Sequence, residues 1–225
     1  MEMKKIFAII PAHNEQKSIS EVIRKAKAYV DEVVLVDDGS KDRTAELGGR
    51  SGAVVLRHIV NLGKGAALKT GCDYAVRKGA KFIVALDADA QHRPEDIPRF
   101  VEKLEKYDIV FSYRKASKKM PVILRFGNLA ISGIVRMVYG VNLKDTQSGF
   151  RAFSEKAYKK IRWNASDYSM ESEMIARAGK QSLKYVQVPI STIYSDKYKG
   201  TTIIDGMKIV LNMIWWRLFN GYSRN

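Results

Sequence analysis

Two carboxylates separated by one residue follow an apolar run near the middle of the chain. The run is Phe82–Leu86, and the segment Asp87-Ala88-Asp89-Ala90-Gln91-His92 comes directly after it. Residues i and i+2 of a strand point to the same side, so Asp87 and Asp89 would face one cavity at the strand's end. Two hard oxygen ligands suit a divalent cation, and a cation suits a phosphorylated ligand. These residues alone leave a second interpretation open, in which Asp87 caps a helix near Pro94 and Asp89 is solvated.

Two further polar clusters follow short apolar runs, and periodicity predicts the elements that would position all three. Pro11-Ala12-His13-Asn14-Glu15 follows residues 5–10, and Asp37-Asp38-Gly39-Ser40 follows residues 33–36. The apolar runs lack alternation, which is typical of strands buried on both faces. The expected strands are 5–10, 33–36, 53–56, 81–86, 109–112 and 182–189, and the expected helices are 19–30, 44–48, 64–77, 95–107, 168–178 and 203–219.

Strands that alternate with helices predict a mostly parallel α/β sheet with right-handed crossovers. Ligands bind beyond the carboxyl ends of such strands, so the three polar clusters predict an active-site edge. Because no linker, repeat or low-complexity segment interrupts the chain, we expect one domain over residues 1–225. Residues 1–112 would form the ligand-binding half, and residues 113–225 an elaborated, more helical half.

Composition limits the class of protein. The chain has 225 residues, 46% of them hydrophobic, and a formal net charge of +15. Such charge favours a polyanionic partner, namely nucleic acid, an anionic membrane or a phosphate-rich substrate, although a lysine-rich surface of a heat-adapted protein would also explain it. The single cysteine, Cys72, excludes an intramolecular disulfide. No signal peptide or membrane-length segment is evident, so we expect a cytoplasmic protein that at most lies on a membrane.

Known phosphate and nucleophile motifs do not fit. Asn61-Leu62-Gly63-Lys64-Gly65 precedes a strong helical pattern, and glycines with free amides at a helix start favour anions. A P-loop would need glycine where His58 stands, and a dinucleotide fingerprint would need glycine where Leu68 stands. No Gly-x-Ser-x-Gly elbow occurs either. Metal-assisted transfer from a nucleoside diphosphate remains the best interpretation.

Five motifs in register resemble those of family 2 glycosyltransferases over essentially the whole chain. They are Pro11-Ala12-His13-Asn14-Glu15, Asp37-Asp38-Gly39-Ser40, Asn61-x-Gly63-Lys64-Gly65, Asp87-x-Asp89-x-Gln91 and Asp145-x-x-Ser148-Gly149-Phe150-Arg151. The polyprenyl-phosphate hexose synthases, which include dolichol-phosphate mannose synthases, are the most similar group. The resemblance implies a GT-A, Rossmann-like fold, a GDP-mannose or UDP-hexose donor, Mg²⁺ or Mn²⁺, and inversion at the anomeric carbon.

Site residues also follow from the resemblance. Asp87, Asp89 and Gln91 would hold the metal. The residues expected to bind the nucleotide sugar are Pro11, His13, Asn14, Glu15, Asp37, Asp38, Gly39, Lys64, Asp87, Ala88, Asp89, Gln91, Arg151, Glu173, Lys197 and Lys199. His13 stands where the family often has an aromatic or aliphatic residue. Ser112-Tyr113-Arg114 reverses the last two residues of the family's Ser-Arg-Tyr.

Arginines are the residues expected to bind the acceptor phosphate. A lipid phosphate is already ionised at neutral pH, so it needs cationic positioning more than a general base. Arg114 and Arg125, with Arg136 third, are the candidates, and Asp145 would lie nearest the reacting centre. The alternatives are surface arginines and a turn cap at Asp145. Glu171 and Glu173 would either touch sugar hydroxyls or be solvated, and Lys197 and Lys199 would either close over the diphosphate or belong to an ordinary basic loop.

Two apolar segments fit a lipid acceptor. Met120–Tyr139 combines arginines with aliphatic side chains, and Ile203–Phe219 ends in Trp215-Trp216-Arg217-Leu218-Phe219. With the charge of +15 this mix predicts docking on an anionic membrane surface, although core helices or a dimer interface would also explain it. Other functions remain as alternatives: a soluble glycan or protein acceptor, a nucleotidyltransferase, or a nucleic-acid binder. The acidic clusters argue against nucleic acid.

Overall fold

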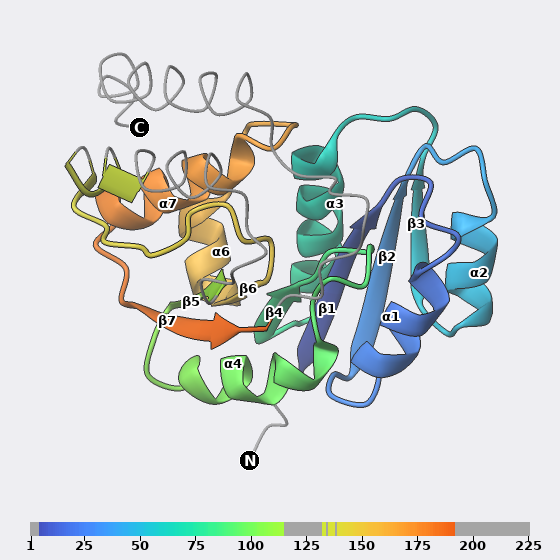
Figure 1. The fold of residues 1–225 in the computed structure, drawn as a ribbon, viewed down its shortest axis with the longest axis horizontal. Coiled ribbons are helices and arrows are strands. Elements are labelled where there is room, and N and C mark those ends of the chain that lie inside the picture. The colour runs from blue at the N-terminus through green and yellow to red at the C-terminus, as the bar shows by residue number, and fades with distance from the viewer. Residues whose placement is uncertain (1–4, 115–131, 134, 138, 192–225) are drawn as a thin grey trace.

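The apolar runs of the sequence form the strands of one sheet in the computed structural model of the chain, which describes residues 5–114, 132–133, 135–137 and 139–191 (Figure 1). Its strands are β1 (Ile6–Ala12), β2 (Glu32–Asp38), β3 (Val54–His58), β4 (Phe82–Ala85), β5 (Ile109–Arg114), β6 (Arg151–Ser154) and β7 (Tyr185–Ile190). Its helices are α1 (Ile19–Ala26), α2 (Thr44–Arg50), α3 (Lys64–Arg77), α4 (Ile97–Lys103), α6 (Glu155–Ile161) and α7 (Met170–Lys180), and the short 3₁₀ helix η1 (Pro94–Asp96) leads into α4.

Helices cover both faces of the sheet, which explains why its strands are apolar without alternation. Along β1, Phe7 and Ile9 belong to one core cluster, whereas Ala8 and Ile10 belong to the other. Successive residues of a strand point to opposite faces, so both sets need an apolar partner. The first cluster packs under α3, α6 and α7, and the second packs under α1 and α4.

The sheet order is β3-β2-β1-β4-β6-β5-β7. All neighbours are parallel except β6, which runs antiparallel to β4 and to β5. The expected α/β class with a mostly parallel sheet is therefore confirmed. Arg151, the first residue of β6, pairs with Ala85 at the end of β4. The loop that precedes β6 consequently reaches the same edge as the carboxyl ends of the parallel strands.

Several expected elements differ from the observed ones. The helix expected over 64–77 is α3, but the helix expected over 95–107 is shorter and begins as η1. Strand β4 ends at Ala85, so Asp87 and Asp89 lie on the turn beyond it and not within the strand. Strand β6 and helix α6 were not expected from the sequence. The expected helix 203–219 and most of Met120–Tyr139 lie outside the described residues.

Within the part of the chain that the structure describes, no helix is both long and apolar enough to cross a membrane.

Candidate active site

The three polar clusters do share one edge of the sheet, as the sequence predicted. Strands β2, β1 and β4 are adjacent and parallel, so the segments after them leave the sheet at the same side (Figure 1). Strand β5 ends at this edge too, and the loop before β6 returns to it. The aspartates of the first half of the chain and the Asp145–Arg151 segment of the second half therefore lie at the same edge of the sheet.

One lysine joins two carboxylates at the centre of this edge. Lys64, the first residue of α3, places its Nζ 2.7 Å from Oδ1 of Asp87 and 3.0 Å from Oε1 of Glu171 in α7. Burial would lower the pKa of Lys64, but the two carboxylates outweigh burial and raise it above its ordinary value. Burial alone would likewise raise the pKa of Asp87, yet the Lys64 ammonium outweighs burial and holds it at about 2. The lysine and Asp87 are therefore both charged at neutral pH.

Asp87 is also packed closely by backbone. A Cβ placed on Gly149 would lie 2.4 Å from Oδ2 of Asp87, so only glycine allows the Ser148-Gly149-Phe150 turn to approach the carboxylate. On the other side, Nδ1 of His92 lies 3.6 Å from the same oxygen, and the His92 ring lies 5.6 Å from that of Phe150. Burial lowers the pKa of His92 despite the nearby aspartates, so this imidazole is neutral at pH 7.

Asp89 has a different environment from Asp87. Its Oδ1 accepts a hydrogen bond from the backbone N–H of Gln91 at 3.0 Å, across Ala90, which has a positive φ of 61°. Burial first, and then the charge of Asp87, raise the pKa of Asp89 above its ordinary value. Two carboxylates that repel each other in a partly buried turn are better satisfied by a divalent cation than by water.

The residues present therefore fit a small hard cation, although they do not enclose one. The described part of the chain holds no cluster of three or more histidine, cysteine, aspartate or glutamate side chains suited to a metal. Asp87, Asp89 and the amide oxygen of Gln91 would supply a partial oxygen set, and diphosphate oxygens would complete it. The alternative that Asp87 caps a helix is wrong. The residue that precedes η1 is Arg93, and no side chain caps it.

The aspartates after β2 hold backbone in place. Both oxygens of Asp38 accept backbone hydrogen bonds, Oδ1 from Leu62 at 2.9 Å and Oδ2 from Gly63 at 2.8 Å. Oδ1 also lies 2.7 Å from Nδ1 of His58, a residue whose role the sequence did not indicate. Asp37 is fully buried and lies 3.0 Å from Nε of Arg57. Asp38 thus fixes the loop between β3 and α3, whereas Asp37 is held against β3.

Position 39 requires glycine because the loop between β3 and α3 lies directly against it. Gly39 has a φ of +70°, and a Cβ there would lie 2.6 Å from the backbone nitrogen of Asn61. The Asp37–Ser40 turn and the 59–63 loop are therefore in direct backbone contact.

The Pro11–Glu15 segment is tied to the same turn. Nδ1 of His13 lies 2.7 Å from the carbonyl oxygen of Asp38. Asn14, with a positive φ of 56°, accepts from the backbone N–H of Lys41 at 2.9 Å and donates its own N–H to Oγ of Ser40 at 2.9 Å. The side chains of His13 and Asn14 remain exposed, whereas Pro11 and Glu15 are half-buried.

Arg114 and Asp145 form the main charged pair on the other side of the edge. Nε of Arg114 donates to Oδ2 of Asp145 at 2.7 Å, and its Nη2 donates to Oδ1 at 3.1 Å. Asp145 is almost completely buried, at 4% exposure. A two-point pair of this kind fixes the plane of the guanidinium. Arg136 is exposed. Arg125, Lys197 and Lys199 lie outside the described residues.

Arg151 is buried and bound to backbone carbonyls. Its guanidinium donates to Thr146 at 2.7 Å, Ser148 at 2.9 Å and Glu171 at 3.0 Å. Burial lowers its pKa from the ordinary value. The side chain expected to meet the nucleotide sugar therefore holds the Asp145–Phe150 loop against α7, and hydroxyls of Ser112 and Ser148 make a further link beneath it.

The Glu173 carboxylate also binds backbone N–H groups. Its carboxylate accepts from the N–H groups of Asn164 and Ala165 and pairs with Arg177 at 2.7 Å. The segment that it holds packs against the start of α3, where a Cβ on Gly65 would lie 2.4 Å from the carbonyl oxygen of Ala165. Nothing in the sequence spacing indicated this contact, because the partners belong to different halves of the chain.

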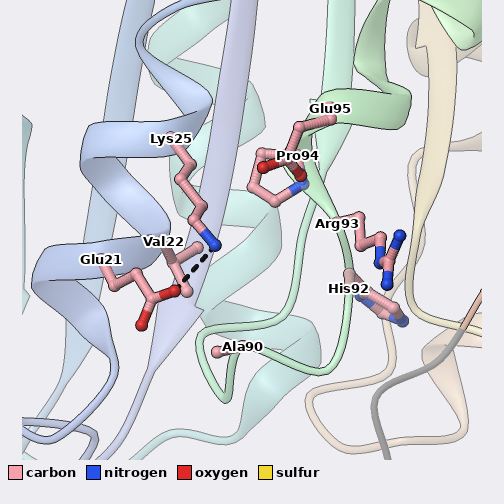
Figure 2. Close-up of a pocket in the computed structure, with 8 residues that line it drawn as sticks. All are labelled: Glu21, Val22, Lys25, Ala90, His92, Arg93, Pro94 and Glu95. Carbon is pink, nitrogen blue, oxygen red and sulfur yellow. Dashed lines mark ion pairs between the residues drawn. The ribbon is translucent and has the colours of Figure 1, made fainter.

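A separate pocket of about 350 Å³ lies beside the aspartate turn, between α1 and the segment that leads into α4 (Figure 2). Figure 2 shows the Glu21–Lys25 ion pair on its α1 wall and Ala90 on the opposite wall. Neither Asp87 nor Asp89 lines it, so this hollow adjoins the candidate site and does not contain it.

Residues 7–162 match the sequence model of glycosyl transferase family 2. The chain belongs to this family. Several relatives of this family 2 glycosyltransferase match it over nearly their whole length. An uncharacterised protein of Methanocaldococcus jannaschii is 39% identical over 95% of this chain and 93% of its own.

Two relatives carry functional names. The UDP-N-acetylglucosamine–dolichyl-phosphate N-acetylglucosaminyltransferase of Methanococcus voltae is 32% identical, over 97% of this chain and 98% of its own. The undecaprenyl-phosphate mannosyltransferase of Micrococcus luteus is 28% identical, over 95% and 94%.

A solved structure confirms the GT-A fold. Glucosyl-3-phosphoglycerate synthase from Mycobacterium tuberculosis, in complex with Mg²⁺ and uridine diphosphate, superposes with a TM-score of 0.76 at 20% identity. The match covers 96% of this chain and 79% of the synthase. This likeness confirms the α/β architecture that the motifs predicted. The family match makes the protein a glycosyltransferase.

Proposed function

We propose that the protein transfers a hexose or an N-acetylhexosamine from a nucleoside-diphosphate sugar to a polyprenyl phosphate, with the help of a divalent cation and with inversion at the anomeric carbon. The observation that carries the proposal is the end-to-end match with a relative named as a dolichyl-phosphate N-acetylglucosaminyltransferase. The edge of the sheet supports the proposal. It combines oxygen ligands for a cation with two basic side chains, Lys64 and Arg114, that are each held by a carboxylate.

The donor would lie across the carboxyl ends of β1, β2 and β4. Asp87, Asp89 and Gln91 would hold the cation, which when bound neutralises the departing diphosphate. The Lys64 ammonium adds a second positive charge beside Asp87. His13 and Asn14 are exposed and would contact the nucleoside. Asp38 would shape that end of the site by fixing the loop between β3 and α3, and Asp37 by fixing its own turn at Ser40.

The acceptor phosphate would be positioned by Arg114, with Arg125 and Arg136 as further candidates. Because the phosphate is already ionised, the protein needs to orient it and exclude water more than to remove a proton. Asp145 is buried and binds Arg114 at two points, so it would aim the guanidinium at the reacting centre.

A lipid acceptor implies contact with a membrane. The donor edge carries exposed aliphatic side chains on the loop between β3 and α3, with Ile59 fully exposed, Val60 at 59% and Leu62 at 50%. Apolar tips on a chain of charge +15 suit peripheral docking on an anionic surface, which would be the cytoplasmic face of the membrane.

The acceptor is tested by product extraction. The protein is incubated with Mn²⁺, a polyprenyl phosphate and each of radiolabelled UDP-N-acetylglucosamine, UDP-glucose and GDP-mannose. The expected result is a labelled lipid that partitions into butanol with one of these donors. Label that appears only on an added glycan or protein would replace the lipid acceptor with a soluble one, and label nowhere would overturn the proposal.

The metal assignment has its own test. Wild-type protein should gain thermal stability from the preferred sugar nucleotide in the presence of Mn²⁺, and Asp89→Ala should lose the Mn²⁺-dependent part while staying folded. Asp96→Ala is the matched control, because Asp96 lies in η1 and pairs only with Arg99 among the described contacts. A wild-type Mn²⁺ response in Asp89→Ala would remove Asp89 from the metal site.

A further inference from the structure

Glu171 is a buried carboxylate whose side chain reaches across the two halves of the chain. It lies in the first turn of α7 at 2% exposure, and its Oε1 is 3.0 Å from Nζ of Lys64 at the start of α3. A carboxylate removed from water needs a cation or hydrogen-bond donors to offset its desolvation. The Lys64 ammonium supplies this partner, so α7 is attached to the donor edge through one ion pair.

The backbone of Glu171 is attached to the acceptor side. Its carbonyl oxygen accepts from Nη1 of Arg151 at 3.0 Å, and the same guanidinium holds the carbonyls of Thr146 and Ser148. These two residues follow Asp145, the partner of Arg114, in the same loop. Any shift of Glu171 would therefore be transmitted to the donor side through Lys64 and to the acceptor side through Arg151.

The ammonium of Lys64 is shared unequally between its two carboxylates. It lies 2.7 Å from Asp87, which is the expected metal ligand, and 3.0 Å from Glu171, which is not one. A divalent cation at Asp87 would compete with the ammonium for that carboxylate, because both are attracted by its negative charge. Without a second anion nearby, a flexible lysine would then move toward solvent.

We propose that Glu171 is a positioning residue that anchors the Lys64 ammonium at the donor edge when the cation occupies Asp87, so that Lys64 stays in place to meet the diphosphate. This inference rests on the proposed nucleotide-sugar donor. It assigns Glu171 no contact with the sugar, and it makes Lys64 an internal counterion of the aspartate turn in the ligand-free protein.

The first measurement needs no ligand. Lys64 acetylation by acetic anhydride is followed by peptide mass spectrometry in wild type, Glu171→Gln and Glu155→Gln. The expected result is slow acetylation in wild type and in Glu155→Gln, and a rate raised roughly tenfold in Glu171→Gln, because one charged hydrogen bond to the ammonium is lost. Glu155→Gln is the control, since the Glu155 carboxylate at the start of α6 pairs with Lys159 and not with Lys64. Equal rates in all three proteins would overturn the proposal.

The second measurement separates positioning from sugar contact. Dissociation constants with Mn²⁺ are measured by calorimetry for UDP and for UDP-N-acetylglucosamine, or for the GDP pair if the protein prefers guanine. If Glu171 anchors Lys64, Glu171→Gln weakens both ligands by the same factor, about tenfold. A loss confined to the sugar nucleotide would show a direct sugar contact and overturn the proposal.

A second variant covers a failure to fold. Glu171→Asp keeps the charge on a shorter side chain, and it should give acetylation and binding intermediate between wild type and Glu171→Gln. Wild-type values in Glu171→Asp together with an unfolded Glu171→Gln would mean that Glu171 is needed for packing alone. Wild-type protein that binds no nucleotide would count against the donor, and the acetylation rates would still judge whether Glu171 anchors Lys64.

Discussion

Asp87 and Asp89 are two residues apart, yet their pKa values shift in opposite directions. Both carboxyl groups are desolvated, which favours the neutral acid. Lys64 reverses this effect at Asp87, whereas Asp89 experiences mainly the negative charge of Asp87. A bound cation would relieve Asp89 most, so metal binding and ionisation of Asp89 would support each other.

The Asp87–Lys64 pair makes stability depend on pH. Folding lowers the pKa of Asp87 from 3.8 to about 2, so its contribution is complete above 3.8 and is lost as pH falls through about 2. Asp87→Asn should therefore cost on the order of 2 kcal/mol near neutral pH, and about half of that difference should be gone by about pH 3.

Urea unfolding of wild type and Asp87→Asn across this pH range measures the effect. Glu102→Gln serves as the control, because Glu102 is a solvent-exposed carboxylate on α4. If the difference in unfolding free energy between wild type and Asp87→Asn does not change with pH, Lys64 does not lower the pKa of Asp87.

The residue types of the site could be predicted from the sequence, but the partners of those residues could not. Asp38, Asp87, Asp89 and Asp145 were expected at one edge of the sheet, and they lie there. The Lys64–Glu171 pair and the contacts of Arg151 were not expected, because they join positions far apart in the chain. Periodicity reports which face of an element is buried, and it carries no information on which distant element lies there.

At the scale of elements, the start of α3 is fitted to its neighbours without room for a side chain. A Cβ on Gly65 would lie 2.4 Å from the carbonyl oxygen of Ala165 and 2.9 Å from that of Asp167. Backbone atoms cannot move aside as the end of a flexible side chain can. Gly65→Ala should therefore push the 163–168 segment away from α3 and disturb Lys64 beside it.

We expect Gly65→Ala to lower the free energy of unfolding by roughly 3 kcal/mol, in the range of overpacked core substitutions. Gly49→Ala in α2 is the control, because a Cβ there lies 3.7 Å from Cγ2 of Val55, an ordinary contact. That change should be neutral or stabilising by up to about 1 kcal/mol. Chemical denaturation of both variants gives the comparison, and equal stability would contradict the close fit.

The sequence predicted long elements better than short ones. The 14 residues of α3 were placed correctly, since a helix of that length repeats its apolar spacing several times. Strand β6 has only four residues, Arg151–Ser154, which is too few to show alternation. Helix α6 follows it at once, and its buried Ala157, Tyr158 and Ile161 do have helical spacing that could have indicated it.

For the whole molecule, the net charge of +15 and the exposed aliphatic loop between β3 and α3 predict binding to anionic membranes. The protein should cosediment with vesicles that contain phosphatidylglycerol and much less with pure phosphatidylcholine, and binding should weaken as salt rises. The donor-induced thermal shift in the absence of vesicles is the control for a folded protein. Equal binding to both vesicle types, or none to either, would contradict docking on an anionic surface.

The place of β6 in the sheet also affects how the protein is made. Among the described strands, β5 pairs only with β6 and β7, and both are synthesised after it. The ribosome therefore releases β5 before any partner for it exists, and β6 must later enter the gap beside β4. A chain halted before residue 151 would leave the β4 edge open to strands of other chains. Completion of the donor edge thus waits for the second half of translation.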